Sequence, residues 1–240
     1  MFALLIVLGA NDMAHIIEAS KLTKIYEYGS EKLYALDEVS FSINKGDIVA
    51  VVGESGSGKT TLVNIVGCLD NPSAGELSVN GRKIFADGIK LSESELTTIR
   101  RKLFGYVFQK FFLIPTLSVR ENILLPSVFQ SKLVVSDVDL DGIMEMLGIL
   151  KRKNHLPKQL SIGEMQRVAI ARALIGKPDI LIADEPTGNL DSKRSNEIKD
   201  LFVNLNRERN ITIILVTHSP ELAKIGNCVL ELRDGRVVSN

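Results

Sequence analysis

Polar and apolar residues alternate in two segments near the start of the chain, "HIIEA" (residues 15–19) and "ALDEVSFSI" (35–43). This period of two is typical of strands with one buried face. Continuous apolar runs follow in "GDIVAVV" (46–52), "DILIAD" (179–184) and "TIILVTH" (212–218). Because both faces of such a run are apolar, each one predicts a strand inside a covered sheet.

Segments with helical periodicity separate these strands. They comprise "KTTLVNIVGCL" (59–69), most of residues 91–174, and about 192–208, and a short strand, "GYVFQ" (105–109), interrupts the second of them. Two hairpins are also predicted, with turns at Asn80-Gly81 and Asp234-Gly235. Apolar strands that alternate with helices predict an α/β fold with a mainly parallel sheet. The helices of residues 91–174 are expected to form an inserted α-helical subdomain.

Composition and charge narrow the function classes. The 240 residues are 45% hydrophobic and 24% charged, with 29 basic and 29 acidic side chains. A zero balance argues against nucleic acid as a partner. Two cysteines, Cys68 and Cys228, are too few for a disulfide framework, which favours a reducing cytosolic setting.

The N-terminal segment "FALLIVLGA" (residues 2–10) is apolar. It is shorter than the roughly 20 residues of a membrane span, and no basic region precedes it as in a signal peptide. A second methionine, Met13, stands directly before the first predicted strand. We therefore expect translation to start at Met13, residues 1–12 to be an upstream extension, and residues 13–240 to form a domain that is soluble by itself.

The stretch "GESGSGKTT" (residues 53–61) joins a predicted strand to a predicted helix and fits G-x-x-x-x-G-K-[ST]. Small residues allow successive backbone N–H groups to turn toward an anion, and the helix N-terminus adds unpaired donors and a positive dipole end. Lys59 would contact the β- and γ-phosphates of a nucleotide, and the Thr60 hydroxyl would bind Mg²⁺. The sequence therefore predicts a phosphate-binding loop that takes ATP and Mg²⁺.

Hydrolysis also requires a metal holder and a group that activates water. Asp184 ends the apolar strand "ILIAD" and can reach the Mg²⁺ shell, and Glu185 follows it directly. Ligands of open α/β sheets bind at the carboxyl ends of strands. Glu185 is therefore the predicted general base that polarises the attacking water.

These motifs, together with five others in order over residues 14–238, resemble the ATP-binding-cassette (ABC) ATPases. "LSIGEMQRVAIARAL" (160–174) resembles the ABC signature and its helix, and the remaining matches are "VFQ" ending in Gln109, "GNLD" ending in Asp191, "LVTH" ending in His218, and "LTKIYEYG" with Tyr26. The similarity is greatest to the lipoprotein-release and macrolide-efflux type of single-cassette ATPase. It implies a P-loop NTPase fold with a mainly parallel core sheet, an antiparallel β subdomain and the inserted helical subdomain.

The resemblance also implies roles for individual residues. Gln109 would complete the Mg²⁺ shell and sense a membrane partner, and His218 would hold the γ-phosphate and the attacking water. Adenine would stack on Tyr26. The phosphates would be bound by the loop around Gly53, Ser55, Gly56, Ser57, Gly58, Lys59, Thr60 and Thr61. The γ-phosphate of an opposite subunit's ATP would meet Ser161, Gly163 and Glu164, with Asp191 coupling the two sites.

One position departs from the family pattern, because Ile162 stands where the signature usually has its first glycine. If residue 162 required a positive φ, isoleucine would be strained there. If Gly163 is instead the point of close approach to phosphate, Ile162 can point away and the signature still works. We favour the second interpretation.

The signature of one chain faces away from that chain's own pocket in this family. We therefore expect a homodimer that sandwiches two ATP molecules, and a separate membrane-spanning permease that docks near Gln109–Val119, where "FFLIPTLSV" is apolar. The protein would then lie in the cytoplasm, peripheral to the membrane through its partner. Three other functions remain open: a non-transport cassette in cell division or signalling, a cassette of DNA repair or translation, and a nucleotide-binding module without turnover.

Overall fold

The computed structural model describes residues 15–29, 31–129 and 133–239. A six-stranded sheet lies at its centre, in the order β11-β10-β3-β9-β8-β7. All neighbours in it are parallel except the β10–β11 hairpin. Its strands are β3 (Ile48–Val52), β7 (Phe104–Val107), β8 (Ile180–Asp184), β9 (Thr212–Val216), β10 (Cys228–Arg233) and β11 (Arg236–Ser239). This is the mainly parallel core sheet that the apolar runs predict.

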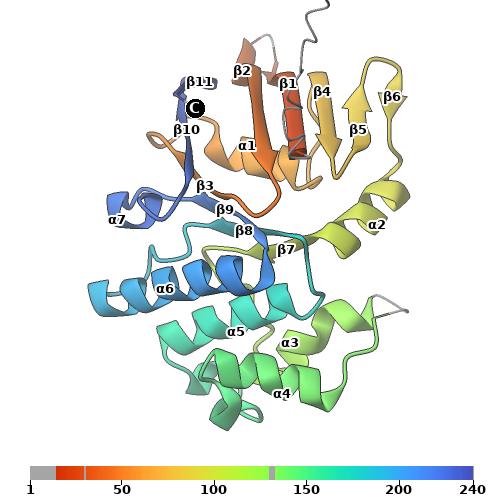
Figure 1. Cartoon of the computed structure of the whole chain (residues 1–240). Coiled ribbons are helices and arrows are strands. Elements are labelled where there is room, and N and C mark those ends of the chain that lie inside the picture. Colours follow the sequence, from red (N-terminus) through yellow and green to blue (C-terminus); the bar gives the residue numbers. More distant parts are fainter. Residues whose placement is uncertain (1–14, 30, 130–132, 240) are drawn as a thin grey trace, which may run out of the picture.

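A second, antiparallel sheet has five strands in the order β2-β1-β4-β5-β6. Its strands are β1 (His15–Tyr28), β2 (Glu31–Asn44), β4 (Ala74–Val79), β5 (Arg82–Ala86) and β6 (Ile89–Lys90). Figure 1 shows this sheet above the parallel sheet, with helix α1 (Lys59–Val66) between them. Buried residues of both sheets and of α1 pack into one hydrophobic core.

The opposite face of the parallel sheet is covered by helices (Figure 1). They are α3 (Val119–Val128), α4 (Asp137–Met146), α5 (Ile162–Leu174) and α6 (Ser192–Arg209). Their buried residues, such as Ile123, Met144, Ile170 and Phe202, form a second core with the sheet. The remaining helical elements are α2 (Glu93–Leu103), α7 (Pro220–Ala223) and the 3₁₀ turns Leu150–Arg152 and Pro157–Gln159.

Local sequence fixes where three of these helices begin. Helices α2, α3 and α5 each start with a reciprocal capping box, in which a serine side chain and a glutamate three residues later bond each other's backbone N–H. The pairs are Ser92/Glu95, Ser118/Glu121 and Ser161/Glu164. Each box satisfies two N–H groups that a helix start otherwise leaves unpaired. The third box also places the signature at the first turn of α5.

Several sequence expectations concern organisation rather than single elements. The proposed extension at residues 1–12 lies outside the described residues. Residues 91–174 contain α2, β7, α3, α4 and α5, and their assignment as a separate subdomain stays a prediction. Among the described residues, no helix combines the length and the apolar character that crossing a bilayer requires.

Candidate functional site

Four strands of the parallel sheet deliver the predicted site residues to one edge. The strands β3, β9, β8 and β7 are neighbours and parallel, so their carboxyl ends lie together. β3 leads into the glycine-rich loop, β8 into Asp184 and Glu185, β9 toward His218, and β7 toward Gln109. Segments far apart in the sequence thus meet at the edge where ligands of such sheets bind.

The loop after β3 uses its glycines for backbone geometry. Gly53 has a φ of 146°, and a Cβ there would stand 2.2 Å from the carbonyl oxygen of Leu232. Gly58 has a φ of 104°, and its Cβ would stand 2.3 Å from the carbonyl oxygen of Ala35. No residue with a side chain fits at either point without moving the backbone. The turn that ends in helix α1 therefore depends on both glycines.

Lys59 is buried at the start of α1, and its ammonium donates to the carbonyls of Gly53 (2.9 Å) and Glu54 (2.6 Å). Burial lowers the pKa of Lys59, and the carboxylates of Glu185 and Asp184 act against that shift. Burial raises the pKa of Asp184, opposed by Lys59 and His218. One ammonium and two carboxylates therefore face the same space at the loop, where an anion and a cation can be held together.

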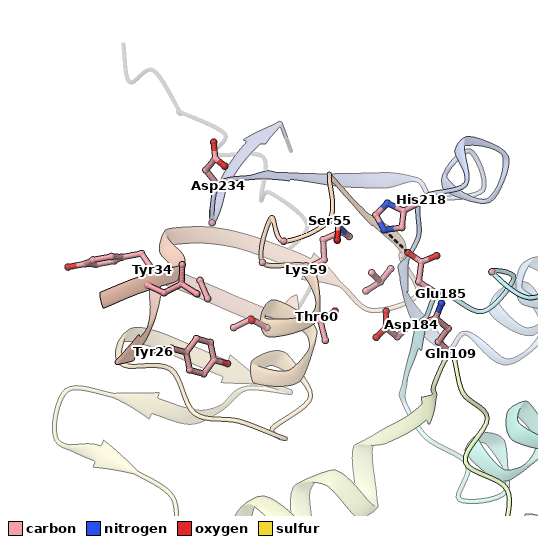
Figure 2. Close-up of a pocket in the computed structure, with 18 residues that line it drawn as sticks. Tyr26, Tyr34, Ser55, Lys59, Thr60, Gln109, Asp184, Glu185, His218 and Asp234 are labelled. Atoms are coloured by element: carbon pink, nitrogen blue, oxygen red, sulfur yellow. Dashed lines mark ion pairs between the residues drawn. The ribbon is translucent and has the colours of Figure 1, made fainter. Parts of the chain in front are cut away.

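Glu185 and His218 face each other across the sheet edge, and Figure 2 marks the contact. His218 Nε2 lies 3.1 Å from Glu185 Oε1, outside hydrogen-bond geometry, and that oxygen is buried without a hydrogen-bond partner among the described residues. Glu185 also holds a φ of +47°. Left-handed non-glycine residues and unpaired buried oxygens both cost free energy and collect at functional sites. The carboxylate is thus free to accept a proton from a bound molecule.

These residues line a cavity of about 780 Å³, a volume in the range of ligand pockets. Figure 2 shows it as elongated, with Tyr26 and Tyr34 at one end, Lys59 and Thr60 in the middle, and Asp184, Glu185, Gln109 and His218 at the other end. Of the predicted set, the residues in its wall are Tyr26, Ser55, Gly56, Gly58, Lys59, Thr60, Thr61, Gln109, Asp184, Glu185 and His218. An aromatic end, an anion-binding middle and a carboxylate end match the shape of a nucleoside triphosphate.

Several wall residues were missed by the sequence analysis. Leu33 and Tyr34 come from β2, and Asp234 and Gly235 come from the turn of the last hairpin. Tyr34 and Leu33 are half exposed. The hydrophobic pattern gives no signal for them, because two exposed apolar residues in a row break the alternation of a half-buried strand. Tyr34 is thus a second aromatic side chain at the tyrosine end of the cavity.

Other predicted residues lie outside this wall. Gly53 and Ser57 belong to the loop but do not line the cavity, and the buried Ser57 Oγ has no hydrogen-bond partner among the described residues. Ser161, Gly163 and Glu164 line a separate cavity of about 390 Å³ between α5 and α6. Asp191 caps α6 by accepting from the Arg194 backbone N–H at 2.9 Å. The signature segment and the nucleotide-shaped cavity of one chain are therefore two distinct places.

The signature itself is unstrained. Ile162 is the first residue of α5, it does not have a positive φ, and its side chain is 44% exposed. Gly163 is buried, and a Cβ there would stand 3.2 Å from the Arg194 side chain. The isoleucine therefore points outward while the glycine is the crowded position.

Glu164 is turned back onto its own chain. Its carboxylate accepts from Arg152 Nε at 2.7 Å and from the Ser161 backbone N–H at 2.8 Å. These bonds lower the pKa of Glu164 to about 2, so the side chain is an anion already neutralised by its neighbours.

The donor set also fits Mg²⁺. Within the described part of the chain, no three His, Cys, Asp or Glu side chains gather as a self-sufficient metal site. The carboxylate of Asp184 and the oxygens of Thr60 and Gln109 line this cavity, with Thr60 in its middle and the other two at one end (Figure 2). Mg²⁺ is usually held by one or two carboxylates together with substrate phosphates and water. The residues present therefore suit a metal ion that arrives with a phosphate ligand.

The fold and this cavity together define a P-loop nucleotide-binding cassette. The family model described as ABC transporter matches residues 36–188. The chain therefore belongs to the ABC transporter family, and within that family it is an ATP-binding subunit that hydrolyses ATP.

Individual relatives agree with this assignment. The ABC transporter ATP-binding protein MJ0796 of Methanocaldococcus jannaschii is 43% identical, with 92% of this chain and 95% of the relative covered. Its dimeric structure has a TM-score of 0.84 at 42% identity, covering 92% of this chain and 96% of that one. A dimeric post-hydrolysis structure of the same protein, bound to ADP and Pi, has a TM-score of 0.83 at 41% identity, again covering 92% and 96%.

A second relative is much longer than this chain. The macrolide export ATP-binding/permease protein MacB of Chlorobaculum tepidum is 42% identical over 94% of this chain but only 34% of the relative. The chain therefore spans about a third of the MacB proteins it matches.

Proposed function

We propose that two copies of this cassette close around two ATP molecules and drive a separate membrane-spanning permease. The observation that carries the proposal is the separation of the signature cavity from the nucleotide cavity on one chain. A signature segment that lies apart from the nucleotide cavity of its own chain can contact the nucleotide bound to a second copy. The relative MJ0796 has a dimeric structure, which supports the pairing of two cassettes. MacB is named as both an ATP-binding protein and a permease of macrolide export, which supports a cassette–permease pair of the export type.

The residues of the nucleotide cavity have different roles according to their position. Lys59, Thr61 and the backbone N–H groups of residues 55–60 would bind the phosphates, and Thr60, Asp184 and Gln109 would hold Mg²⁺. Mg²⁺, when bound, neutralises charge on the β- and γ-phosphates. Glu185 accepts the proton of the attacking water, and His218 holds that water and the γ-phosphate. The adenine stacks at the tyrosine end, on Tyr26.

The signature would complete the site from the second copy. Ser161 and Gly163 stand at the first turn of α5, where unpaired backbone N–H groups and the helix dipole favour an anion. Glu164 contributes through the cap that it makes with Ser161 rather than with a free carboxylate. Asp191, which begins α6, lies beside this cavity and would link the two ATP sites.

The proposed permease contact is an apolar groove of about 520 Å³. It lies beside the segment that follows Gln109, and its apolar wall includes Leu69, Phe104, Phe108, Phe112 and Phe129. Phe112 and Phe129 are 60% and 65% exposed. Three arginines, Arg100, Arg101 and Arg172, also line it. Its occupant would be a short amphipathic helix of the permease, with an apolar face and an acidic or carbonyl-rich end.

The test is co-purification of the tagged full chain from detergent-solubilised membranes of its own organism. We expect one membrane-spanning protein in stoichiometric amount. Phe112→Ser and Phe129→Ser should lose it while MgATP affinity stays within about twofold, because exposed groove side chains carry interface energy but touch no phosphate. Val138→Ser is the matched control, since Val138 is 82% exposed and outside the groove. Retention of the membrane protein by both groove variants would contradict the proposal.

The proposal also implies where the cassette lies in the cell and disfavours the alternative functions. The cassette would lie at the cytoplasmic face of the membrane, held there by the permease. The relatives reported above are named for transporters, which favours transport over the role in cell division or signalling. Nucleic acid has no part in the proposed function.

A further inference from the structure

The segment between Gln109 and α3 contains two consecutive residues in a left-handed conformation. Phe111 has a φ of +56° and Phe112 a φ of +46°. Neither residue is of a type enriched in this region, and a bulky side chain there is a genuine outlier. A turn of this kind persists only where its surroundings hold it in place.

One side chain holds both residues. The guanidinium of Arg172 donates to the carbonyl of Phe112 through Nη1 at 2.6 Å and to the carbonyl of Phe111 through Nη2. Arg172 belongs to α5, the helix whose first turn carries the signature. The planar guanidinium donates to the two successive carbonyls from two atoms in a fixed geometry, whereas a lysine ammonium would donate from one atom at the end of a flexible chain.

The rest of the segment is fastened as well. The buried Asn122 of α3 accepts from the Ile114 backbone N–H at 2.7 Å and donates to the carbonyls of Ile114, Leu117 and Ser118 at 2.9–3.1 Å. At the other end, Asn189 Nδ2 donates to the carbonyl of Gln109 at 3.2 Å. Between these two anchors, Arg172 is the side chain that hydrogen-bonds the turn itself within the described part of the chain.

The turn connects the two ligand surfaces of the proposed function. Gln109, two residues before it, lines the nucleotide cavity, whereas Phe112 lines the apolar groove. Phe112 packs edge-on against Phe108, with ring centroids 5.4 Å apart, and Phe108 stacks on Tyr106 at 5.9 Å. A change in the turn would therefore displace Gln109 and the groove wall together.

We propose that Arg172 is a positioning residue for Gln109. Its guanidinium holds the left-handed turn at Phe111 and Phe112 in place through two hydrogen bonds. Through these bonds the groove, the nucleotide cavity and the signature helix α5 move as one unit. The proposal rests on the proposed function only for the roles of Gln109 and of the groove. It can be tested on the isolated full chain, without a permease.

The first test separates positioning from binding. Arg172→Lys keeps the charge and loses the planar guanidinium. We expect kcat for ATP to fall about tenfold with KM for MgATP within about twofold, because a misplaced catalytic contact lowers turnover more than ground-state binding. Arg120→Lys is the control, since Arg120 lies on α3 and pairs with Asp137 instead of the turn. Unchanged kcat, or a rise in KM that matches the fall in kcat, would overturn the proposal.

The second test asks for rescue. Glycine takes a positive φ without strain, so Phe111→Gly should restore much of the lost kcat in the Arg172→Lys background. Phe111→Ala, which removes the same ring but keeps the strain, should not. A merely structural role for Arg172 predicts no difference between the two double variants, and that result would contradict the proposal.

A spectroscopic readout reports the turn directly. The chain has no tryptophan, so Phe112→Trp supplies a single indole in the groove wall. Because Phe112 is already 60% exposed, adding Arg172→Lys should raise the acrylamide quenching constant of the indole by about 1.5-fold, as a released turn exposes the ring further. Equal quenching with and without Arg172 would overturn the proposal. This readout needs neither ATP turnover nor a permease, so a failed permease purification would count against the proposed function alone.

Discussion

Nε2 of His218 lies 3.1 Å from Oε1 of Glu185, although the two side chains leave different strands of the parallel sheet. The register explains the meeting, because Asp184 at the end of β8 pairs with Val216 at the end of β9. Glu185, one residue beyond β8, and His218, two residues beyond β9, therefore lie next to each other at the sheet edge. Glu185 Oε1 is also buried without a hydrogen bond among the described residues, so this oxygen can still accept one from a bound molecule.

The first prediction follows from that carboxylate. Glu185→Gln keeps the shape of the side chain and removes the base. We expect turnover to fall by about 10²-fold or more, while ATP is still bound. Because hydrolysis normally ends the sandwich, the variant should accumulate as an ATP-dependent dimer on a sizing column.

Glu221→Gln is the matched control, since Glu221 is an exposed carboxylate on α7 that pairs with Lys224. It should hydrolyse ATP and elute like the unmodified chain. A Glu185→Gln protein that stays monomeric in saturating ATP would exclude the sandwich for this chain.

Much of the parallel sheet and the loop could be predicted from the sequence, because the physical signals there are local. Runs such as "ILIAD" and "TIILV" are apolar on both faces, and the loop requires glycines where a side chain would strike the backbone. These signals are enough to bring Lys59, Asp184, Glu185 and His218 to one edge.

Where alternation is broken, the prediction falls short. The sequence predicts a first strand over residues 15–19, but β1 extends to Tyr28, since its register with β2 shifts at Ala19/Leu22 and Leu22/Lys24 and Lys21 has a φ of +48°. Bulges of this kind change which face each side chain takes. Helix α4 ends at Met146, although apolar residues continue at Leu147 and Ile149, because Gly148 takes a left-handed conformation just beyond it.

A second prediction concerns the loop backbone. Gly53→Ala puts a Cβ 2.2 Å from the Leu232 carbonyl oxygen in addition to the strain of a positive φ. Gly81→Ala shares the positive φ but meets open space. Both should lose roughly 1 kcal/mol of stability or more from strain. Only Gly53→Ala should also lose the heat of MgATP binding in calorimetry. Normal binding by Gly53→Ala would mean that the loop tolerates a shifted backbone.

A third prediction separates the two tyrosines. The Tyr26 hydroxyl donates to Asp70 at 3.2 Å, and Lys24 Nζ lies 5.1 Å from its ring centroid, so the ring is held in place. If adenine stacks on it, Tyr26→Ala should weaken ATP binding about tenfold. Tyr26→Phe, which keeps the ring, should bind ATP as the unmodified chain does. A larger loss for Tyr34→Ala than for Tyr26→Ala would assign the stacking to Tyr34.

A fourth prediction concerns pH and the signature. The bonds of Glu164 to the Ser161 backbone and to Arg152 lower its pKa from 4.5 to about 2 in the folded chain. The stabilisation is therefore complete above about pH 4.5 and is lost as the pH falls toward 2. Glu164→Gln should lower the free energy of unfolding at pH 7, and the difference from the unmodified chain should shrink between pH 5 and pH 3, about the window that the shift defines. Urea titrations measure it.

Arg152→Gln provides the control for this pair. In a double-mutant cycle, the coupling between positions 152 and 164 should decrease as the pH approaches 2, because Glu164 of the folded chain is protonated and the ion pair is lost only near its pKa of about 2. A coupling that stays constant from pH 7 to about pH 2 would show that the contact is not ionic in solution.

The last prediction concerns the metal end of the cavity. The carboxylate of Asp184 lines the cavity together with Thr60 and Gln109. Burial raises the pKa of Asp184, whereas Lys59 and His218 oppose the shift. Asp184→Asn should raise the Mg²⁺ concentration for half-maximal ATP turnover by about tenfold or more. Asp234→Asn makes the same chemical change in the wall of the same cavity, away from Asp184 (Figure 2), and should leave that concentration unchanged. An equal shift in both variants would point to general loss of negative charge, and no shift in either would remove Asp184 from the metal site.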